Sequence, residues 1–320
     1  MGQGPDICLM VNPGSGREGA KEKGAWLDSA CARHPGRFER RDLQRGEPVA
    51  EQVRRAAEEG FARIGAAGGD GTVAGVAAGL AGLGEGAPEL AVIPLGTFNY
   101  FARGISLPLD TDAAVDLAAA GRAAPVATGD VNGQLFLNNA SLGLYPEVLR
   151  RRERIYARWG RSRPAALWSV GRTILRAEGP EALRVTLDGE TVRRRSPLAF
   201  VARSAFQLER FGLPGADCVR DGRFAVFLAP DGSRAELLAL AVRLAVGQAE
   251  AGRDFDWFCA SEATIETPGR RRTVACDGER REMDGPFRFT VRDASLRVVQ
   301  PGREGHPGDE EGSARPGPGA

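Results

Sequence analysis

Apolar positions in the first 127 residues form short runs that alternate with stretches of helical pattern. The strand candidates are residues 7–11, 38–43, 62–67 and 90–94, and the helix candidates are residues 18–33, 49–60, 72–83 and 111–120. Strands that alternate with helices in this way indicate a parallel sheet covered by helices on both faces. We therefore predict an α/β N-terminal domain with a parallel sheet over residues 1–127.

The pattern changes at about residue 128, where short β-like runs are separated by turns. The runs are 134–137, 183–187, 198–201, 224–228, 263–266, 287–291 and 296–299, with helices expected near 146–177 and 233–247. Asp188-Gly189 and Asp277-Gly278 have the composition of hairpin turns. This half predicts a β-rich sandwich as the C-terminal domain, over residues 128–300. Residues 301–320 contain ten Gly or Pro and no apolar period, which predicts a disordered tail.

A glycine-rich loop follows the third strand candidate. Gly68, Gly69 and Gly71 surround a single acid, Asp70, and the next predicted helix begins at Thr72. Glycines let backbone N–H groups approach a ligand closely, and a helix N-terminus carries unpaired donors and partial positive charge. The loop therefore predicts a phosphate site. A plain tight turn is the alternative, because Gly-Asp-Gly also favours turns.

Two other strand candidates end in similar loops. Their polar and glycine residues are Gly96, Thr97 and Asn99 after residues 90–94, and Asn12, Ser15, Gly16 and Arg17 after residues 7–11. Parallel strands bring their carboxyl ends to one edge of a sheet, where open α/β sheets bind ligands. We therefore expect the three loops to form one site.

Three motifs, in this order along the chain, carry a family resemblance: Asn12-Pro13-x-Ser15-Gly16, Gly68-Gly69-Asp70-Gly71-Thr72 and Pro94-Leu95-Gly96-Thr97-x-Asn99. The chain resembles the diacylglycerol kinase catalytic domain family in its soluble bacterial lipid kinase branch, which is also similar to sphingosine kinases. The resemblance runs from about residue 7 to residue 299 and includes Asp221-Gly222-Arg223-Phe224 and Asp277-Gly278-Glu279. It implies an ATP-dependent kinase that transfers the γ-phosphate to a lipid hydroxyl, of diacylglycerol or a related lipid.

Roles for individual residues follow from the resemblance. The positions expected to bind ATP are Asn12, Ser15, Gly16, Arg17, Gly68, Gly69, Asp70, Gly71, Thr72, Gly96, Thr97 and Asn99. Asp70 is expected to be catalytic, as the carboxylate on the Mg²⁺ side of the phosphates. Glu279 is expected to be the general base that deprotonates the lipid hydroxyl, although by itself it reads as an exposed acid. Asp221 matches a position that holds a second, structural Mg²⁺, and an ordinary turn residue is the alternative there.

The chain departs from the family pattern at two acids. Tyr100 and Ala127 stand where many family members have aspartates of a network that organises Mg²⁺. The predicted metal site is therefore poor in negative charge, with Asp70 as its main carboxylate. Asp130, close by in the sequence, is a candidate replacement.

Composition narrows the chemistry further. The 320 residues have a net charge of +1, only two histidines, and no CxxC pair among five cysteines. The base must therefore be a carboxylate, and any metal must be a hard, oxygen-ligated ion such as Mg²⁺. Single, scattered cysteines predict reduced thiols and a cytoplasmic protein. No apolar run is long enough to span a bilayer.

A lipid substrate requires contact with a membrane surface. Residues 149–163 contain seven arginines with Ile155, Tyr156 and Trp159 between them, which predicts peripheral contact at the inner face of the membrane. A solvated basic face is the alternative, and no nucleic-acid partner is indicated. The oligomeric state is left open. The other functions that fit the loops are an NAD kinase-like enzyme and a catalytically weakened nucleotide- or lipid-binding protein.

Overall fold

The computed structural model of the protein describes residues 5–12, 20–144, 179–245 and 247–301. In its N-terminal half a parallel sheet has the order β2-β1-β3-β4. The strands are β1 (Ile7–Val11), β2 (Phe38–Asp42), β3 (Arg63–Gly68) and β4 (Glu89–Pro94), and the helices are α1 (Ala20–Ala32), α2 (Val49–Glu58), α3 (Asp70–Ala81), α4 (Tyr100–Gly104) and α5 (Thr111–Ala120). All strands and helices expected here are confirmed with ends shifted by two residues at most, and α4 is an addition.

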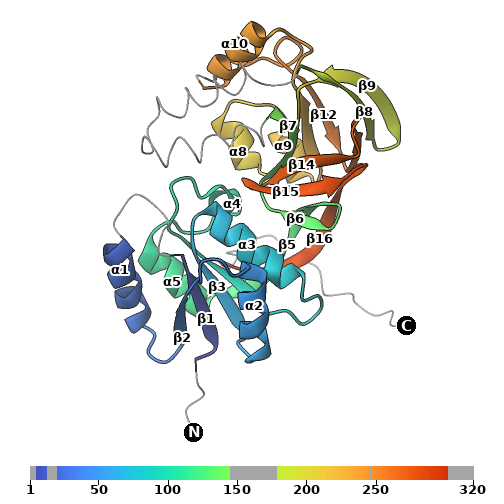
Figure 1. The fold of residues 1–320 in the computed structure, drawn as a ribbon. Coiled ribbons are helices and arrows are strands. Elements are labelled where there is room, and N and C mark those ends of the chain that lie inside the picture. The colour runs from blue at the N-terminus through green and yellow to red at the C-terminus, as the bar shows by residue number, and fades with distance from the viewer. Residues whose placement is uncertain (1–4, 13–19, 145–178, 246, 302–320) are drawn as a thin grey trace, which may run out of the picture.

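Side chains of the central strands alternate between two apolar layers. Cys8 and Met10 of β1 pack with α2 and α3, whereas Leu9 and Val11 pack with α1 and α5. Successive residues of a strand point to opposite faces, so a strand buried on both sides must be apolar throughout. This explains why β1 reads as a continuous apolar run. Figure 1 shows the helices on either side of this sheet.

The C-terminal half is the predicted sandwich of antiparallel sheets. Its strands and helices are β5 (Arg122–Val131), β6 (Gln134–Phe136), β7 (Asn139–Gly143), β8 (Glu181–Leu187), β9 (Glu190–Ser196), β10 (Leu198–Ala202), α8 (Ala205–Arg210), α9 (Ala216–Arg220), β11 (Phe224–Leu228), α10 (Arg234–Ala245), β12 (Asp256–Ala260), β13 (Glu262–Glu266), β14 (Arg271–Cys276), β15 (Glu279–Asp284) and β16 (Phe287–Gln300). One sheet has the order β12-β11-β10-β7-β14-β15. Its inner face packs on β8, β13 and the first part of β16 around the buried rings of Phe136, Phe224, Phe287 and Phe289.

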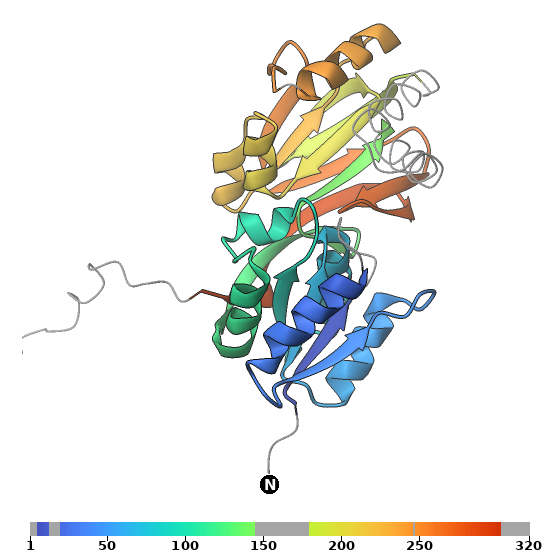
Figure 2. The ribbon, with the colours of Figure 1, turned by 90° about the vertical axis from the view of Figure 1, so that its left-hand side faces the viewer.

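A single strand joins the two halves. The two apolar runs expected at 287–291 and 296–299 are one strand, β16, with an irregularity between Arg292 and Leu296. β16 pairs with β13 near its start and with β4 at Val298 and Leu90, and it pairs with β5 along most of its length. The parallel sheet therefore continues into the sandwich as one ten-stranded sheet. Figure 2 shows the N-terminal half, in blue and green, below the C-terminal half, in yellow and orange.

The expected division between residues 127 and 128 falls inside β5, and it stays a prediction. Residues 302–320 of the expected tail and the basic segment 149–163 lie outside the described residues. No helix in the described ranges is long and apolar enough to cross a membrane.

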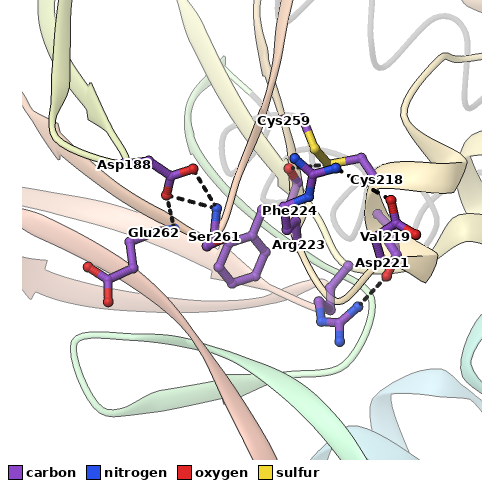
Figure 3. Close-up of a disulfide and its surroundings, with 10 residues drawn as sticks. Asp188, Cys218, Val219, Asp221, Arg223, Phe224, Cys259, Ser261 and Glu262 are labelled. Carbon is purple, nitrogen blue, oxygen red and sulfur yellow. Dashed lines mark hydrogen bonds and ion pairs between the residues drawn. A yellow bond between two sulfur atoms is a disulfide. The ribbon is translucent and has the colours of Figure 1, made fainter.

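The expectation that all cysteines are reduced is wrong. Cys218 of α9 and Cys259 of β12 form a disulfide, with their Cα atoms 5.9 Å apart (Figure 3). The two residues are separated by 41 positions in the sequence and meet because α9 leads into β11, which pairs with β12. No spacing rule could show this contact. Cys8, Cys31 and Cys276 are free thiols, as expected.

Gly129 of β5 offers a test of the join between the halves. A Cβ at Gly129 would lie 2.3–2.8 Å from three ring atoms of Phe136, which is fully buried. We expect Gly129→Ala to lower the free energy of unfolding by about 1–3 kcal/mol through overpacking, as measured by urea denaturation. Gly179→Ala is the matched control, because nothing lies within 4 Å of its Cβ position, and it should change stability by less than about 0.5 kcal/mol. Equal stability of both variants would contradict close packing at β5.

Candidate active site

The loops after β3 and β4 touch each other. The two strands pair along their length, with Gly68 opposite Pro94, so their loops leave the sheet at the same edge. A Cβ at Gly96 would lie 2.6 Å from the Cα of Gly69, and a Cβ at Gly68 would lie 2.5–2.8 Å from three side-chain atoms of Thr72. Glycine is required at position 96 because two backbones approach closely there, and at position 68 because the Thr72 side chain occupies the space of a Cβ. The structure thus brings the second and third predicted motifs together.

Two asparagines hold the loops in place. Asn99 has a left-handed backbone (φ 51°), and its side-chain oxygen accepts from Gly96 N at 3.0 Å while its amide donates to Gly96 O at 3.1 Å. Asn12, at the end of β1, donates to the Thr72 hydroxyl at 3.0 Å. The first loop therefore joins the other two at Asn12. Thr97 is exposed, so its hydroxyl is open to a ligand.

Asp70 is the first residue of α3, with Gly69 as the N-cap. Its Oδ1 accepts a hydrogen bond from Phe101 N at 3.2 Å, which ties the glycine loop to α4. Burial raises the pKa of Asp70, and the backbone N–H groups of Phe101, Tyr100 and Asn99 oppose this by favouring the carboxylate. A partly desolvated carboxylate at a helix N-terminus is a place where a cation and phosphate oxygens can offset each other's charge.

Glu279 reaches this loop from the C-terminal half. It is the first residue of β15, after the Asp277-Gly278 turn, in which both residues have positive φ (50° and 91°). A Cβ at Gly71 would lie 3.9 Å from Glu279 Oε1. In Figure 1 the β14–β15 hairpin lies above α3 and α4. The predicted base and the predicted phosphate loop, about 210 positions apart in the sequence, are therefore neighbours in the fold.

Asp277 fixes the hairpin that carries Glu279. Its carboxylate accepts from Leu137 N at 2.6 Å, from Asn138 N at 2.7 Å and from Asn139 N at 3.2 Å. Burial raises its pKa to about 6, the three N–H groups act against this, and the charge of Asp70 adds a smaller increase. Sequence reasoning treated Asp277 only as a turn residue. The missed signal was an acid in the left-handed position of a hairpin turn, where it can bind the backbone of a neighbouring strand.

Position 100, where many family members have an aspartate, carries a tyrosine that packs against other aromatic rings. Tyr100 stacks on Phe98, with ring centroids 5.4 Å apart, and lies 6.3 Å from the ring of Phe206 on α8. Asp130, the candidate replacement for the acid missing at Ala127, accepts from Gly133 N at 2.8 Å and lies 2.7 Å from Arg292, and its role at the metal stays a prediction. Asp70 is thus the main carboxylate of the glycine loops.

Several predicted residues are not joined to this cluster. Ser15, Gly16 and Arg17 lie outside the described residues. Asp221 is exposed after α9, and its carboxylate pairs with Arg223 at 3.4 Å. Within the described ranges no three His, Cys, Asp or Glu side chains are grouped so that they could hold a metal ion. The assignment of Asp221 to a metal stays a prediction. Asp70 supplies one carboxylate, which fits Mg²⁺ when phosphates and water complete the ligands, because Mg²⁺ is commonly held by one or two carboxylates together with phosphates and water.

Asp277→Asn should destabilise the protein. Asparagine keeps the left-handed turn but leaves only one acceptor oxygen for three N–H groups, so we expect a loss of about 1–3 kcal/mol in the free energy of unfolding at pH 5. The raised pKa means that the wild-type carboxyl contributes most below pH 4 and less as the pH rises towards 6. The difference between wild type and variant in urea denaturation should therefore narrow from pH 4.5 to pH 7.

Asp284→Asn is the matched control for this prediction. Asp284 lies at the other end of β15, and its carboxylate has only a 3.9 Å ion pair with exposed Arg270. We expect a change below about 0.5 kcal/mol, since surface pairs contribute little. A gap between Asp277→Asn and wild type that widens with pH would contradict a raised pKa at Asp277.

Comparisons with known proteins agree on one family. Residues 6–131 match the model of the diacylglycerol kinase catalytic domain. A Pseudomonas aeruginosa protein named "Probable lipid kinase YegS-like" is 46% identical over 96 residues, which are 30% of this chain and 31% of that protein. A diacylglycerol kinase of Bacillus subtilis is 45% identical over 97 residues, 30% of this chain and 32% of its own. The chain matches about a third of the length of these relatives.

Longer matches extend over most of the chain. A diacylglycerol kinase of Staphylococcus aureus is 29% identical over 242 residues, which are 72% of each protein. The structure of a diacylglycerol kinase from Bacillus anthracis superimposes with a TM-score of 0.65 at 19% identity, over 94% of this chain and 99% of that one. This likeness shows that the fold is shared. The loops after β3 and β4 leave the sheet at one edge, and residues 6–131, which contain them, are similar to the diacylglycerol kinase catalytic domain.

Proposed function

We propose that the protein is an ATP-dependent lipid kinase that transfers the γ-phosphate to a hydroxyl of diacylglycerol or a related lipid. The observation that carries the proposal is the approach of Glu279 to Gly71 at the start of α3. A carboxylate across from a phosphate-binding loop is the arrangement that phosphoryl transfer to an alcohol needs. The names of the relatives, lipid kinase and diacylglycerol kinase, support the same class of acceptor.

In this proposal the N-terminal half binds ATP and Mg²⁺, and the C-terminal half supplies the general base. The glycine loops and the first turn of α3 offer close backbone and N–H donors to the phosphates of ATP. Mg²⁺, held by Asp70 together with the phosphates, would offset their negative charge. Glu279 accepts the proton of the lipid hydroxyl while the lipid oxygen bonds to the γ-phosphorus and the bond to the ADP oxygen breaks. Asp277 keeps Glu279 in place through the backbone of residues 137–139.

Membrane contact is part of the proposal. A lipid acceptor stays in the bilayer, so the lipid hydroxyl must reach Glu279 and Gly71 from the membrane surface. We place the protein in the cytoplasm, with peripheral contact at the inner face of the membrane. The basic segment 149–163 is the proposed contact, on the strength of its composition.

The direct test offers ATP and Mg²⁺ with diacylglycerol in mixed micelles, and NAD in parallel. We expect labelled phosphate from ATP in the extracted lipid and none in NAD. Phosphorylation of NAD faster than of every lipid tested would establish the NAD kinase alternative instead. ATP binding without turnover on any acceptor would favour the weakened binding protein.

Asp70→Asn should lower lipid phosphorylation by at least about 100-fold with the fold retained, because the loops lose their main carboxylate. The Mg²⁺ concentration for half-maximal rate should rise as well. Circular dichroism and urea denaturation would establish that the variant is folded. Asp217→Asn, at a side chain that is 95% exposed on α9, is the control and should keep the wild-type rate. If Asp70→Asn turned over at a rate near that of the wild type, Asp70 would have no catalytic role and would be only a turn residue.

Glu279→Gln should reduce the turnover number by roughly 100- to 10,000-fold while the dissociation constant for ATP changes little, since a base acts on the acceptor. Turnover and ATP affinity would be measured on the same preparation. Glu282→Gln, at an exposed position of the same strand, should retain activity. Unchanged turnover in Glu279→Gln would return Glu279 to the role of an exposed acid.

A further inference from the structure

Two of the five cysteines, Cys218 and Cys259, form a disulfide, and the other three are free thiols. Cys8, Cys31 and Cys276 are free, and burial raises their pKa values to about 11, 11 and 12, so they remain protonated and unreactive at neutral pH. Cys218 and Cys259 are joined instead. A protein that keeps three thiols and one disulfide holds two kinds of cysteine, and only the joined pair has a bond that thiols can exchange.

One cysteine of the pair is better exposed than the other. Cys218 is 6% exposed, whereas Cys259 is half-buried on β12, the edge strand of its sheet. Cys259 also contributes to the wall of a cavity of about 360 Å³, whose other lining residues are Leu187, Asp188, Glu190, Val192 and Phe258. A small thiol therefore reaches Cys259 more easily than Cys218. Attack at Cys259 would release Cys218 as the leaving group.

Cys218 also holds the loop that follows α9. Its carbonyl accepts from Arg223 N at 3.0 Å, and its Sγ lies 3.0 Å from the carbonyl oxygen of Phe224 (Figure 3). Residues 221–224, which we call the α9 loop, carry Asp221, whose carboxylate pairs only with Arg223 among the described residues. Phe224 begins β11, which pairs with β12, and Ala225 lies opposite Cys259. The disulfide thus links α9 directly to β12, and the α9 loop and β11 connect the same two elements through the chain and through strand pairing.

We propose that the Cys218–Cys259 disulfide is a reversible thiol-exchange site and that its redox state sets the order of the α9 loop. The thiolate of a monothiol attacks Cys259 Sγ, forms a mixed disulfide and releases Cys218 as a thiolate. A second thiolate then frees Cys259, so that two thiols are oxidised to one disulfide while both cysteines are reduced. In the reduced state α9 is no longer bonded to β12. The α9 loop, with Asp221, then loses its covalent link to β12 and gains mobility, because only non-covalent contacts remain, such as the Asp221–Arg223 pair and the Arg203 hydrogen bond to the carbonyl of Val219.

The test uses the full-length protein, oxidised and then treated with glutathione or dithiothreitol without denaturant. Alkylation and mass spectrometry should show that Cys218 and Cys259 become labelled only after reduction, and that oxidised glutathione closes the bond again. Hydrogen exchange in residues 217–224 should speed up at least about tenfold on reduction. Tm should fall by roughly 5–10 °C, the size expected when a loop of this length is opened.

Two variants separate the pair from general effects of the reductant. The double variant Cys218→Ser with Cys259→Ser should exchange rapidly at residues 217–224 with or without reductant. Cys31→Ser, which removes a free thiol, should respond to the reductant as the wild type does. A bond that resists 10 mM dithiothreitol in the folded protein, or equal exchange in both redox states, would overturn the proposal. None of these measurements needs turnover, so a failed lipid kinase assay would refute the proposed function and leave this inference standing.

Discussion

β16 pairs in parallel with β4 through Val298 and Leu90, and in antiparallel register with β13 through residues 287–290. β5 follows it for most of its length and then leads into β6 and β7. Because strand pairing fixes both distance and angle, the sandwich has a defined position over the carboxyl ends of β3 and β4. The approach of Glu279 to α3 follows from this shared sheet together with direct contacts between the halves, such as that of Tyr100 on α4 with Phe206 on α8.

The shared sheet explains which strands could be predicted from the sequence and which could not. β1, β3 and β4 are buried on both faces and separated by helices, so apolar runs located them to within one residue, whereas β2 is an edge strand of mostly charged residues. The predicted runs omit β5, β7, β9, β12, β14 and β15, although the turns at Asp188-Gly189 and Asp277-Gly278 indicated hairpins at β8–β9 and β14–β15. β9 and β15 gave no apolar run because they are edge strands with mostly exposed, charged residues. β16 read as two runs because charged residues interrupt it at its irregularity, where Ala294 has a φ of 51°. Edge position and strand irregularity depend on partners that lie far away in the sequence.

The same contrast holds for the candidate site. Glycines and Asn99 were identified from sequence because close backbone approach and a left-handed residue restrict the residue types allowed there. Their partners were not predictable, since Asp277 binds the amides of residues 137–139 from a distance of about 140 positions. The disulfide shows the limit of composition most clearly. An odd number of scattered cysteines favours reduced thiols, yet two of them lie on elements that β11 brings together.

The charge-poor site has a physical consequence for the order of binding. Asp70 lies partly buried among backbone donors, and burial raises its pKa, so its ionised form gains from a neighbouring cation. Acids at positions 100 and 127 would add affinity for a cation in the absence of nucleotide. In this chain Tyr100 and Ala127 carry no negative charge, and the carboxylate of Asp130 lies beside Arg292. With one main carboxylate, most of the negative charge that attracts Mg²⁺ must come from the phosphates themselves. Under the proposed function, cation and nucleotide are therefore expected to bind as one unit.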